Sequence, residues 1–144
     1  MLHVITSLED KLCSCLNDDP VRPNISLEQR INKYSEAILL LDSCTLAPTA
    51  AVCVKYLHKI PSSTQELLSP PKTNSVAVFY SIWSYSKGSG SILLNQSKLH
   101  IANFRPYVKT FVTFSPKSEE VKKFHIKNGA KVYRENKDSI NYMY

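Results

Sequence analysis

The 144-residue sequence lacks any hydrophobic run long enough to cross a membrane. Its longest dense apolar stretch, residues 37–41, is far shorter than the roughly 18–20 residues that a spanning helix needs. We find no internal repeat and no low-complexity tract. The composition, 43% hydrophobic and 21% charged, is that of an ordinary globular protein of about one domain. These features exclude a disordered polymer, a collagen-like chain and a disulfide scaffold.

The few cysteines fit no metal site. Cys13 and Cys15 are separated by one residue, which is not a zinc-knuckle spacing, and Cys44 and Cys53 do not form a second close pair. Cys53 lies in an apolar alternating run, where we expect a small buried side chain. We therefore expect no bound metal. The sequence opens without a secretory signal, which favours an intracellular, reducing compartment.

Positive charge is concentrated in the last third of the sequence. Residues 1–97 hold eight Lys or Arg and eight Asp or Glu, whereas residues 98–144 hold ten and four, so the whole net charge of +6 lies there. A phosphate-bearing ligand, a nucleic acid or an acidic membrane surface would suit this charge, and so would a merely solvated basic face. Aromatic residues are not interleaved with arginine in this segment, which argues against nucleic acid.

Hydrophobic periodicity predicts a small α/β domain. The expected helices cover residues 27–41, 63–68, 92–104 and a segment opening at Ser115-Pro116 and ending at Asn128-Gly129. The expected strands cover residues 51–57, 76–83, 107–114 and 130–134. Residues 38–41 fit a short buried strand equally well. Residues 1–24, rich in turn-forming residues, are expected to be a poorly ordered lead-in to a domain formed by residues 25–144.

Three features are candidates for function. Ser115 follows an expected strand, so it either caps the next helix or points its hydroxyl into a cleft at the strand's carboxyl end. His125, near a helix end beside Asn128, is either structural or an exposed proton carrier. The loop 86–91 precedes a helix and is either a flexible loop or an anion site, although it lacks the Gly-Lys-Ser/Thr of a Walker loop.

Four short blocks, in this order, resemble the C-terminal catalytic domain of malonyl-CoA decarboxylase. They are the strand AVCVKYL (51–57) with the following segment IPSSTQELL (60–68), the strand VAVFYSI (76–82), the Ser-Pro block FVTFSP (111–116) and the Phe-His block FHIKNGA (124–130). The similarity covers roughly residues 44–136. Its specificity lies in the order of the blocks along the sequence.

The resemblance implies a small GNAT-like acyl-CoA domain, an α/β fold with a central, mixed or mostly antiparallel sheet flanked by helices. The family converts malonyl-CoA to acetyl-CoA and carbon dioxide. It uses a serine and a histidine that match Ser115 and His125. The substrate-binding positions implied are Tyr80, Ser81, Lys87, Gly88, Ser89, Gly90 and Asn128. No metal or redox cofactor is implied, because coenzyme A enters as part of the substrate.

The family works in mitochondria, peroxisomes and the cytosol, and no targeting segment indicates which applies here. The sequence does not indicate an oligomeric state. It lacks the family's long helical N-terminal domain, and residues 87–95 match the family's coenzyme A loop only loosely. The long segment that normally separates the serine and histidine blocks is also missing.

The close spacing of Ser115 and His125 sets a geometric problem. A continuous helix spanning these ten residues would rise ~15 Å. The pair can therefore meet only through a loop or a second chain. We expect a shortened, internally deleted form of the decarboxylase with reduced or no turnover. The alternatives are a non-catalytic acyl-CoA-binding domain and a basic nucleic-acid-binding domain.

Overall fold

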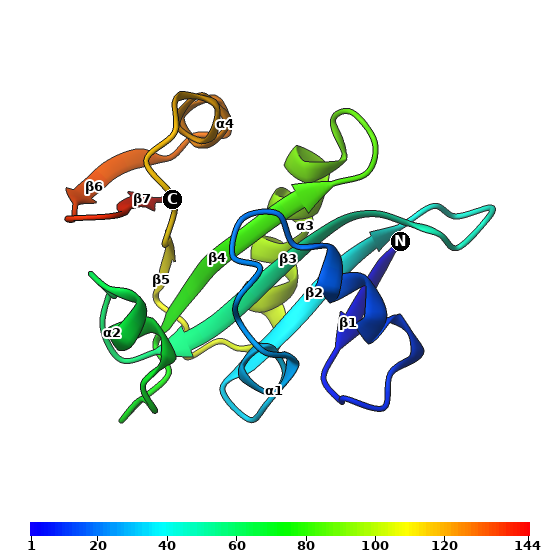
Figure 1. The fold of residues 1–144 in the computed structure, drawn as a ribbon, viewed down its shortest axis with the longest axis horizontal. Helices are drawn as coiled ribbons and strands as arrows, with labels where there is room; N and C mark the ends of the chain where they lie inside the picture. Colours follow the sequence, from blue (N-terminus) through cyan, green and yellow to red (C-terminus); the bar gives the residue numbers. More distant parts are fainter.

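Seven strands form one sheet in the order β1-β2-β3-β4-β5-β7-β6, in a computed structural model that describes residues 1–144. The strands are β1 (Leu2–Ile5), β2 (Ser35–Leu41), β3 (Pro48–Leu57), β4 (Val76–Ser84), β5 (Thr110–Thr113), β6 (Lys131–Glu135) and β7 (Ile140–Met143). The helices are the 3-10 helix η1 (Lys11–Asp18), α1 (Leu27–Arg30), α2 (Thr64–Leu68), α3 (Ser89–Phe104) and α4 (Glu119–Lys127). Neighbouring strands are antiparallel except β4 and β5, which are parallel (Figure 1). The predicted α/β class is confirmed.

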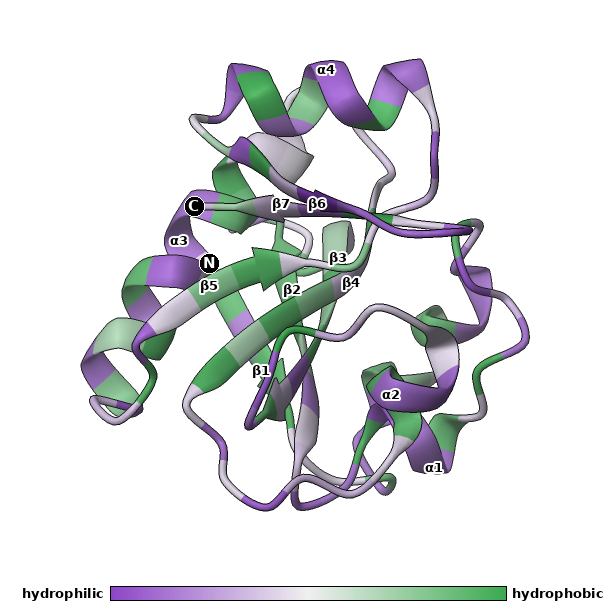
Figure 2. Ribbon diagram, turned by 90° about the vertical axis from the view of Figure 1, so that its left-hand side faces the viewer, coloured by the Kyte–Doolittle hydropathy of each residue, from purple (hydrophilic) through white to green (hydrophobic).

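Each face of the sheet buries its own apolar cluster. Helix α3 covers one face with Leu93, Leu94 and Ile101. The 3-10 helix η1 and helix α2 cover the other face with Leu16 and Leu67. Figure 2 shows α3 on one side of the sheet and α1 and α2 on the other. Because successive side chains of a strand point to opposite faces, strands buried on both sides carry the continuous apolar runs seen in β2 and β3.

Helix α1 is much shorter than predicted. Ser26 caps it as expected, since its side chain accepts a hydrogen bond from the backbone N–H of Gln29 at 3.3 Å. The helix ends at Arg30, and the apolar residues that follow form β2 between β1 and β3. The helix predicted over residues 27–41 is therefore wrong beyond its first turn, and the strand alternative for 38–41 is confirmed. Residues 35–41 form a strand because they pair with β1 on one edge and with β3 on the other, and local periodicity does not reveal this pairing.

Residues 1–24 are not a poorly ordered lead-in. Strand β1 pairs antiparallel with β2, in a register that places Leu2 opposite Leu40. The 3-10 helix η1 then packs Cys13 and Leu16 into the core. The expectation of disorder was wrong because the turn residues of this segment link two elements that are stabilised by distant parts of the chain.

The chain after α4 forms a β-hairpin. Strand β6 lies within one residue of its predicted position, whereas β7 has no predicted counterpart, because the residues around it are largely polar. Strand β7 inserts between β5 and β6.

No helix of the structure combines the length and hydrophobicity that a membrane-spanning segment needs.

Candidate active site

Strands β4 and β5 part at their carboxyl ends. They pair from Val76 opposite Thr110 to Phe79 opposite Thr113, and the N–H of Phe114 donates to the carbonyl of Phe79 at 3.0 Å. Beyond this contact β4 continues beside β3, whereas the chain after β5 turns towards β7 (Figure 1). We call this divergence the β4–β5 split. The carboxyl ends of parallel strands are where α/β folds commonly bind ligands.

A β-bulge lies at the same place in β4. Ser81 pairs with Cys53 and Phe79 pairs with Val54, so Tyr80 is the additional residue. A bulge bends its strand and redirects the neighbouring side chains. Tyr80 and Ser81 are both 2% exposed, and their hydroxyls have no hydrogen-bond partner.

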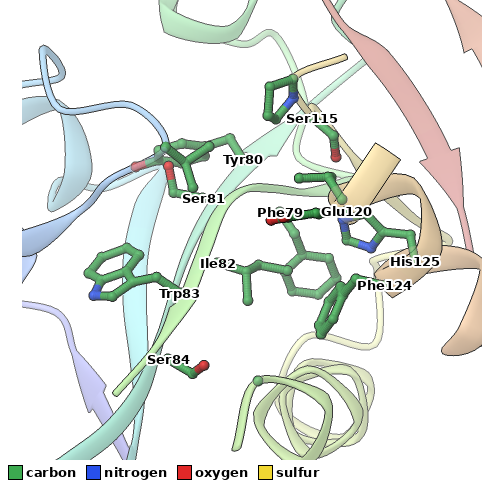
Figure 3. A pocket seen from close by; sticks show the side chains of 14 residues that line it. Phe79, Tyr80, Ser81, Ile82, Trp83, Ser84, Ser115, Glu120, Phe124 and His125 are labelled. Carbon is green, nitrogen blue, oxygen red and sulfur yellow. The ribbon is translucent and has the colours of Figure 1, made fainter. Parts of the chain in front are cut away.

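A pocket of about 200 Å³ lies at the split and is lined by 14 residues. Its walls come from the second half of β4, the first turn of α3, the segment after β5, and α4 (Figure 3). Tyr80, Ser81, Gly90, Ser115 and His125, all expected as site residues, line this one pocket. No lysine or arginine is among its lining residues.

Ser115 is held at the end of β5 and does not cap a helix. Its backbone N–H and C=O bond to Ile140 of β7 at 3.0 and 2.9 Å. Its hydroxyl donates to Thr113 Oγ1 at 2.7 Å, and the residue is only 4% exposed. Helix α4 is capped instead by Ser118, whose side chain accepts from the N–H of Val121. The capping interpretation of Ser115 is therefore wrong, and the interpretation that places it at a cleft is the one realised.

His125 lies in the last turn of α4 and is buried, so of the two expectations the exposed ring is wrong. Its Nδ1 is 2.6 Å from the hydroxyl of Tyr144, and its ring stacks on Tyr142 with centroids 5.1 Å apart. Burial lowers the pKa of His125 from 6.5 to about 4, so the ring is neutral at pH 7. Nε2 forms no hydrogen bond within the chain. Sequence reasoning missed Tyr144, although aromatic residues alternate along the final segment.

A loop between Ser115 and α4 brings Ser115 and His125 to the same pocket without joining them by a hydrogen bond. Helix α4 begins only at Glu119, so residues 116–118 form a non-helical link that lets both side chains line the same pocket (Figure 3). The two side chains do not hydrogen bond to each other: the Ser115 hydroxyl bonds to Thr113, and Nδ1 of His125 bonds to Tyr144.

The loop before α3 is placed beside this pocket. Gly88 has a left-handed backbone, with φ of 83°, and no side chain caps the helix that follows. Gly90 lies under Phe124, and an added Cβ would lie 3.4 Å from its ring, in van der Waals contact. Lys87 precedes these glycines, and the hydroxyl of Ser89 is bonded to that of Ser86 at 2.6 Å.

Asn128 does not line the pocket. Its side-chain amide donates to Ser91 Oγ at 3.1 Å and to the carbonyl of Phe124 at 2.8 Å. This residue therefore ties the end of α4 to the first turn of α3. The left-handed Gly129, with φ of 97°, ends the helix as its sequence predicts.

No protein-family model and no curated protein matches this sequence. Solved structures do match. The GNAT domain of S. lividans PAT has a TM-score of 0.67 at 11% identity and covers 99% of this chain and 88% of that one. The chain has the GNAT fold. Malonyl-CoA decarboxylase from Cupriavidus metallidurans has a TM-score of 0.80 at 17% identity, over 100% of this chain and 60% of that one. AtaTR bound with AcCoA has a TM-score of 0.61 at 10% identity and covers 99% of this chain and 93% of that one.

The resemblance to malonyl-CoA decarboxylase that four sequence blocks carry thus extends to the three-dimensional fold. This GNAT-fold chain spans about three fifths of the length of the decarboxylase it matches. At 17% identity the similarity establishes the fold.

The buried histidine predicts a pH-dependent stability. Between pH 6.5 and about 4 the unfolded chain binds a proton at His125 that the folded protein does not bind, so the free energy of unfolding falls as the pH falls. The slope attributable to this group approaches ~1.4 kcal/mol per pH unit. Urea unfolding at pH 7 and pH 5 measures it. The loss of unfolding free energy between pH 7 and pH 5 should be smaller in His125→Gln than in the wild type. In His58→Gln it should equal the wild-type loss, because His58 is exposed. An equal loss in wild type and His125→Gln would contradict the prediction.

Proposed function

We propose that the chain binds malonyl-CoA at the β4–β5 split and decarboxylates it to acetyl-CoA and carbon dioxide. The observation that carries the proposal is the convergence of Ser115 and His125, from separate blocks of the sequence, on one pocket. The fold supports it, since a malonyl-CoA decarboxylase and a protein bound with AcCoA are among the matching structures.

The chemistry requires two tasks of the pocket. When the bond to the carboxylate breaks, its electron pair moves into the thioester and forms an enolate, whose oxygen needs hydrogen-bond donors. The enolate carbon then needs a proton. The Ser115 hydroxyl, which donates to Thr113 in the free protein, can turn to a ligand oxygen. The Nε2 of His125 is the remaining polar atom without a partner on this ring.

The neutral state of His125 suits the substrate. If the Tyr144 hydroxyl donates to Nδ1, the ring carries its proton on Nε2, the nitrogen without a protein partner. A malonyl carboxylate bound beside the ring raises its pKa from about 4, because an opposite charge favours the imidazolium. As substrate binds, Nδ1 takes a proton from solvent and donates it in a hydrogen bond to the Tyr144 oxygen, and Nε2 delivers its own proton to the enolate carbon, which leaves a neutral ring.

The lack of cationic side chains in the pocket favours decarboxylation. The reaction disperses the negative charge of the carboxylate, so a lysine or arginine paired with it would stabilise the substrate more than the transition state. The lining contains no such residue and includes the carboxylate of Glu120. No lysine or arginine of the lining therefore pairs with the reacting carboxylate, and the only positive charge near it is the one that His125 gains with the substrate and loses when it protonates the enolate.

The start of α3 suits the phosphates of coenzyme A. The left-handed Gly88 leaves the first amides of the helix without a capping side chain, and no acidic residue lies in the first turn. Such a helix terminus favours an anion. Gly90 belongs both to this turn and to the pocket lining, so one ligand can reach both. Lys87 before the helix and Lys127 beside Asn128 supply positive charge near this turn.

A second candidate is an acyl-CoA-binding domain without catalysis. One observation favours it: the Ser115 hydroxyl is already bonded to Thr113, and no hydrogen bond joins Ser115 to His125. In that case the pocket holds the acyl group and leaves it unchanged.

Release of carbon dioxide from malonyl-CoA by the purified chain tests the proposal. We expect turnover in the wild type and a loss of about 10²-fold in Ser115→Ala, the effect of removing one donor to a developing oxyanion. Ser118→Ala is the matched control, because this serine lies three residues away and caps α4 outside the pocket. Coenzyme A binding without turnover, unaffected by Ser115→Ala, would favour the binding domain. Absence of coenzyme A binding would contradict both candidates.

A further inference from the structure

Two backbone carbonyls at the β4–β5 split are held by one side chain that is distant in sequence. The guanidinium of Arg22 donates from Nε to the carbonyl of Tyr80 at 3.1 Å and from Nη2 to the carbonyl of Phe114 at 2.8 Å. Tyr80 is the bulged residue of β4, and Phe114 makes the last contact between the two strands. A buried carbonyl without a partner is costly, so Arg22 supplies bonds that the parting strands no longer provide.

Arg22 is itself held firmly. Its guanidinium carbon lies 4.4 Å from the centre of the Phe114 ring. Its backbone N–H donates to the Asp19 carboxylate at 3.1 Å, and its carbonyl accepts from Arg30 Nη2 at 2.6 Å. Arg30 and Asp19 form a buried ion pair. The preceding residue, Val21, lines the pocket. The backbone of Arg22 is therefore held by hydrogen bonds to Asp19 and Arg30, and its side chain lies at the β4–β5 split.

The two bonded carbonyls directly precede two pocket serines. The Tyr80 carbonyl belongs to the peptide that enters Ser81, and the Phe114 carbonyl to the peptide that enters Ser115. Because a peptide group is planar, fixing the direction of its carbonyl also fixes the orientation of the following N–H and Cα. One planar guanidinium thus sets the orientation of two segments that line the pocket.

We propose that Arg22 is a positioning residue that bridges β4 and the residue after β5 where they diverge and orients Ser81 and Ser115, a role that rests on the proposed function of this pocket. A guanidinium presents two donors in a fixed fork, which a lysine ammonium does not reproduce. The residue touches no reacting group and acts through the backbone of the two serines.

Kinetics of Arg22→Ala and Arg22→Lys test the role. We expect kcat for malonyl-CoA to fall about 10²-fold in Arg22→Ala with a smaller change in KM, because misplacement of a reacting group by about 1 Å has an effect of this size. Arg22→Lys should be more active than Arg22→Ala but less active than the wild type, and methylguanidinium added to Arg22→Ala should restore activity.

Arg105→Ala is the control, since Arg105 is a half-buried arginine whose ion pair, with Glu36, does not involve the pocket residues. We expect this variant to lose stability while kcat is retained.

Amide hydrogen exchange tests whether Arg22 positions the two serines independently of any catalytic activity. Exchange at Ser81 and Ser115 should accelerate in Arg22→Ala relative to Arg105→Ala, with or without turnover. A wild type that neither binds nor turns over acyl-CoA overturns the proposed function, whereas Arg22-specific exchange in the same experiment still supports the positioning of the serines. Equal exchange and equal kcat in Arg22→Ala and Arg105→Ala would overturn the role of Arg22.

Discussion

Replacement of His125 with glutamine should lower kcat for malonyl-CoA by about 10²–10⁴-fold, the contribution of a positioned proton donor. Glutamine retains an amide that can bond to Tyr144 but cannot deliver a proton at neutral pH. The KM should change little, because the coenzyme A moiety is held mainly outside the acyl pocket in the proposed complex. Measurement of released carbon dioxide and of acetyl-CoA under saturating substrate gives kcat directly.

The pH profile provides the control for this assignment. Since burial holds the pKa of His125 at about 4 in the free protein and the ring must take up a proton with the substrate, kcat/KM should fall about tenfold per pH unit above pH 4, with no inflection near pH 6.5. Tyr144→Phe keeps the ring and removes the hydroxyl bonded to Nδ1, so its loss of activity should be smaller than that of His125→Gln. Unchanged kcat in His125→Gln would show that the histidine has only a structural role.

Replacement of Arg30 with methionine should lower the free energy of unfolding by about 3–5 kcal/mol, the cost of leaving one member of a buried ion pair without its partner. Arg30 is 2% exposed and Asp19 is 3% exposed. Arg30 Nη1 lies 2.6 Å from Asp19 Oδ2, and the guanidinium also bonds the carbonyls of Arg22 and Ile25. Methionine fills similar volume but leaves the carboxylate and these carbonyls unpaired. Urea unfolding at pH 7 measures the change.

Two further variants serve as controls for this measurement. Lys59→Ala removes an ion pair with Glu66 in which the lysine side chain is 56% exposed, and it should cost less than about 1 kcal/mol. If Arg30→Met does not fold, the double variant Asp19→Leu with Arg30→Met should fold, because it removes both charges together. A cost for Arg30→Met no greater than that for Lys59→Ala would disprove the structural importance of the buried pair.

Several parts of the fold could be predicted because their information is local. The alternating β-branched and aromatic residues of β4 identify a strand without knowledge of its partners. The same holds for the cap of α2, where Ser63 accepts from Glu66 N–H at 3.1 Å. Ser115 and His125 could be proposed as a pair because each lies in a short block that resembles a known family. Their positions in one pocket agree with that hypothesis.

Other parts depended on contacts that no local pattern encodes. Helical spacing over 27–41 conflicted with strand pairing, and pairing with β1 and β3 prevailed. The burial of His125 was missed because the aromatic residues that enclose it come from β7 and the residue after it. No local pattern pointed to the bridging contacts of Arg22 or to the buried ion pair of Arg30 with Asp19.

Strands β3 to β6, helices α2 and α3 and the caps at Ser26 and Ser63 followed from the sequence alone, because backbone preferences and side-chain periodicity act over a few residues. Ser115 and His125 were proposed as catalytic because their sequence blocks resemble a known family. The tertiary structure decided that residues 1–24 belong to the sheet and core, that a loop separates Ser115 from α4, and that Arg22 bridges the parted strands. The contacts of Arg22 join residues 58 and 92 positions apart, and burial fixes the charge state of His125. Both are properties of the assembled fold, since long-range pairing and solvent exclusion exist only when the distant segments have come together.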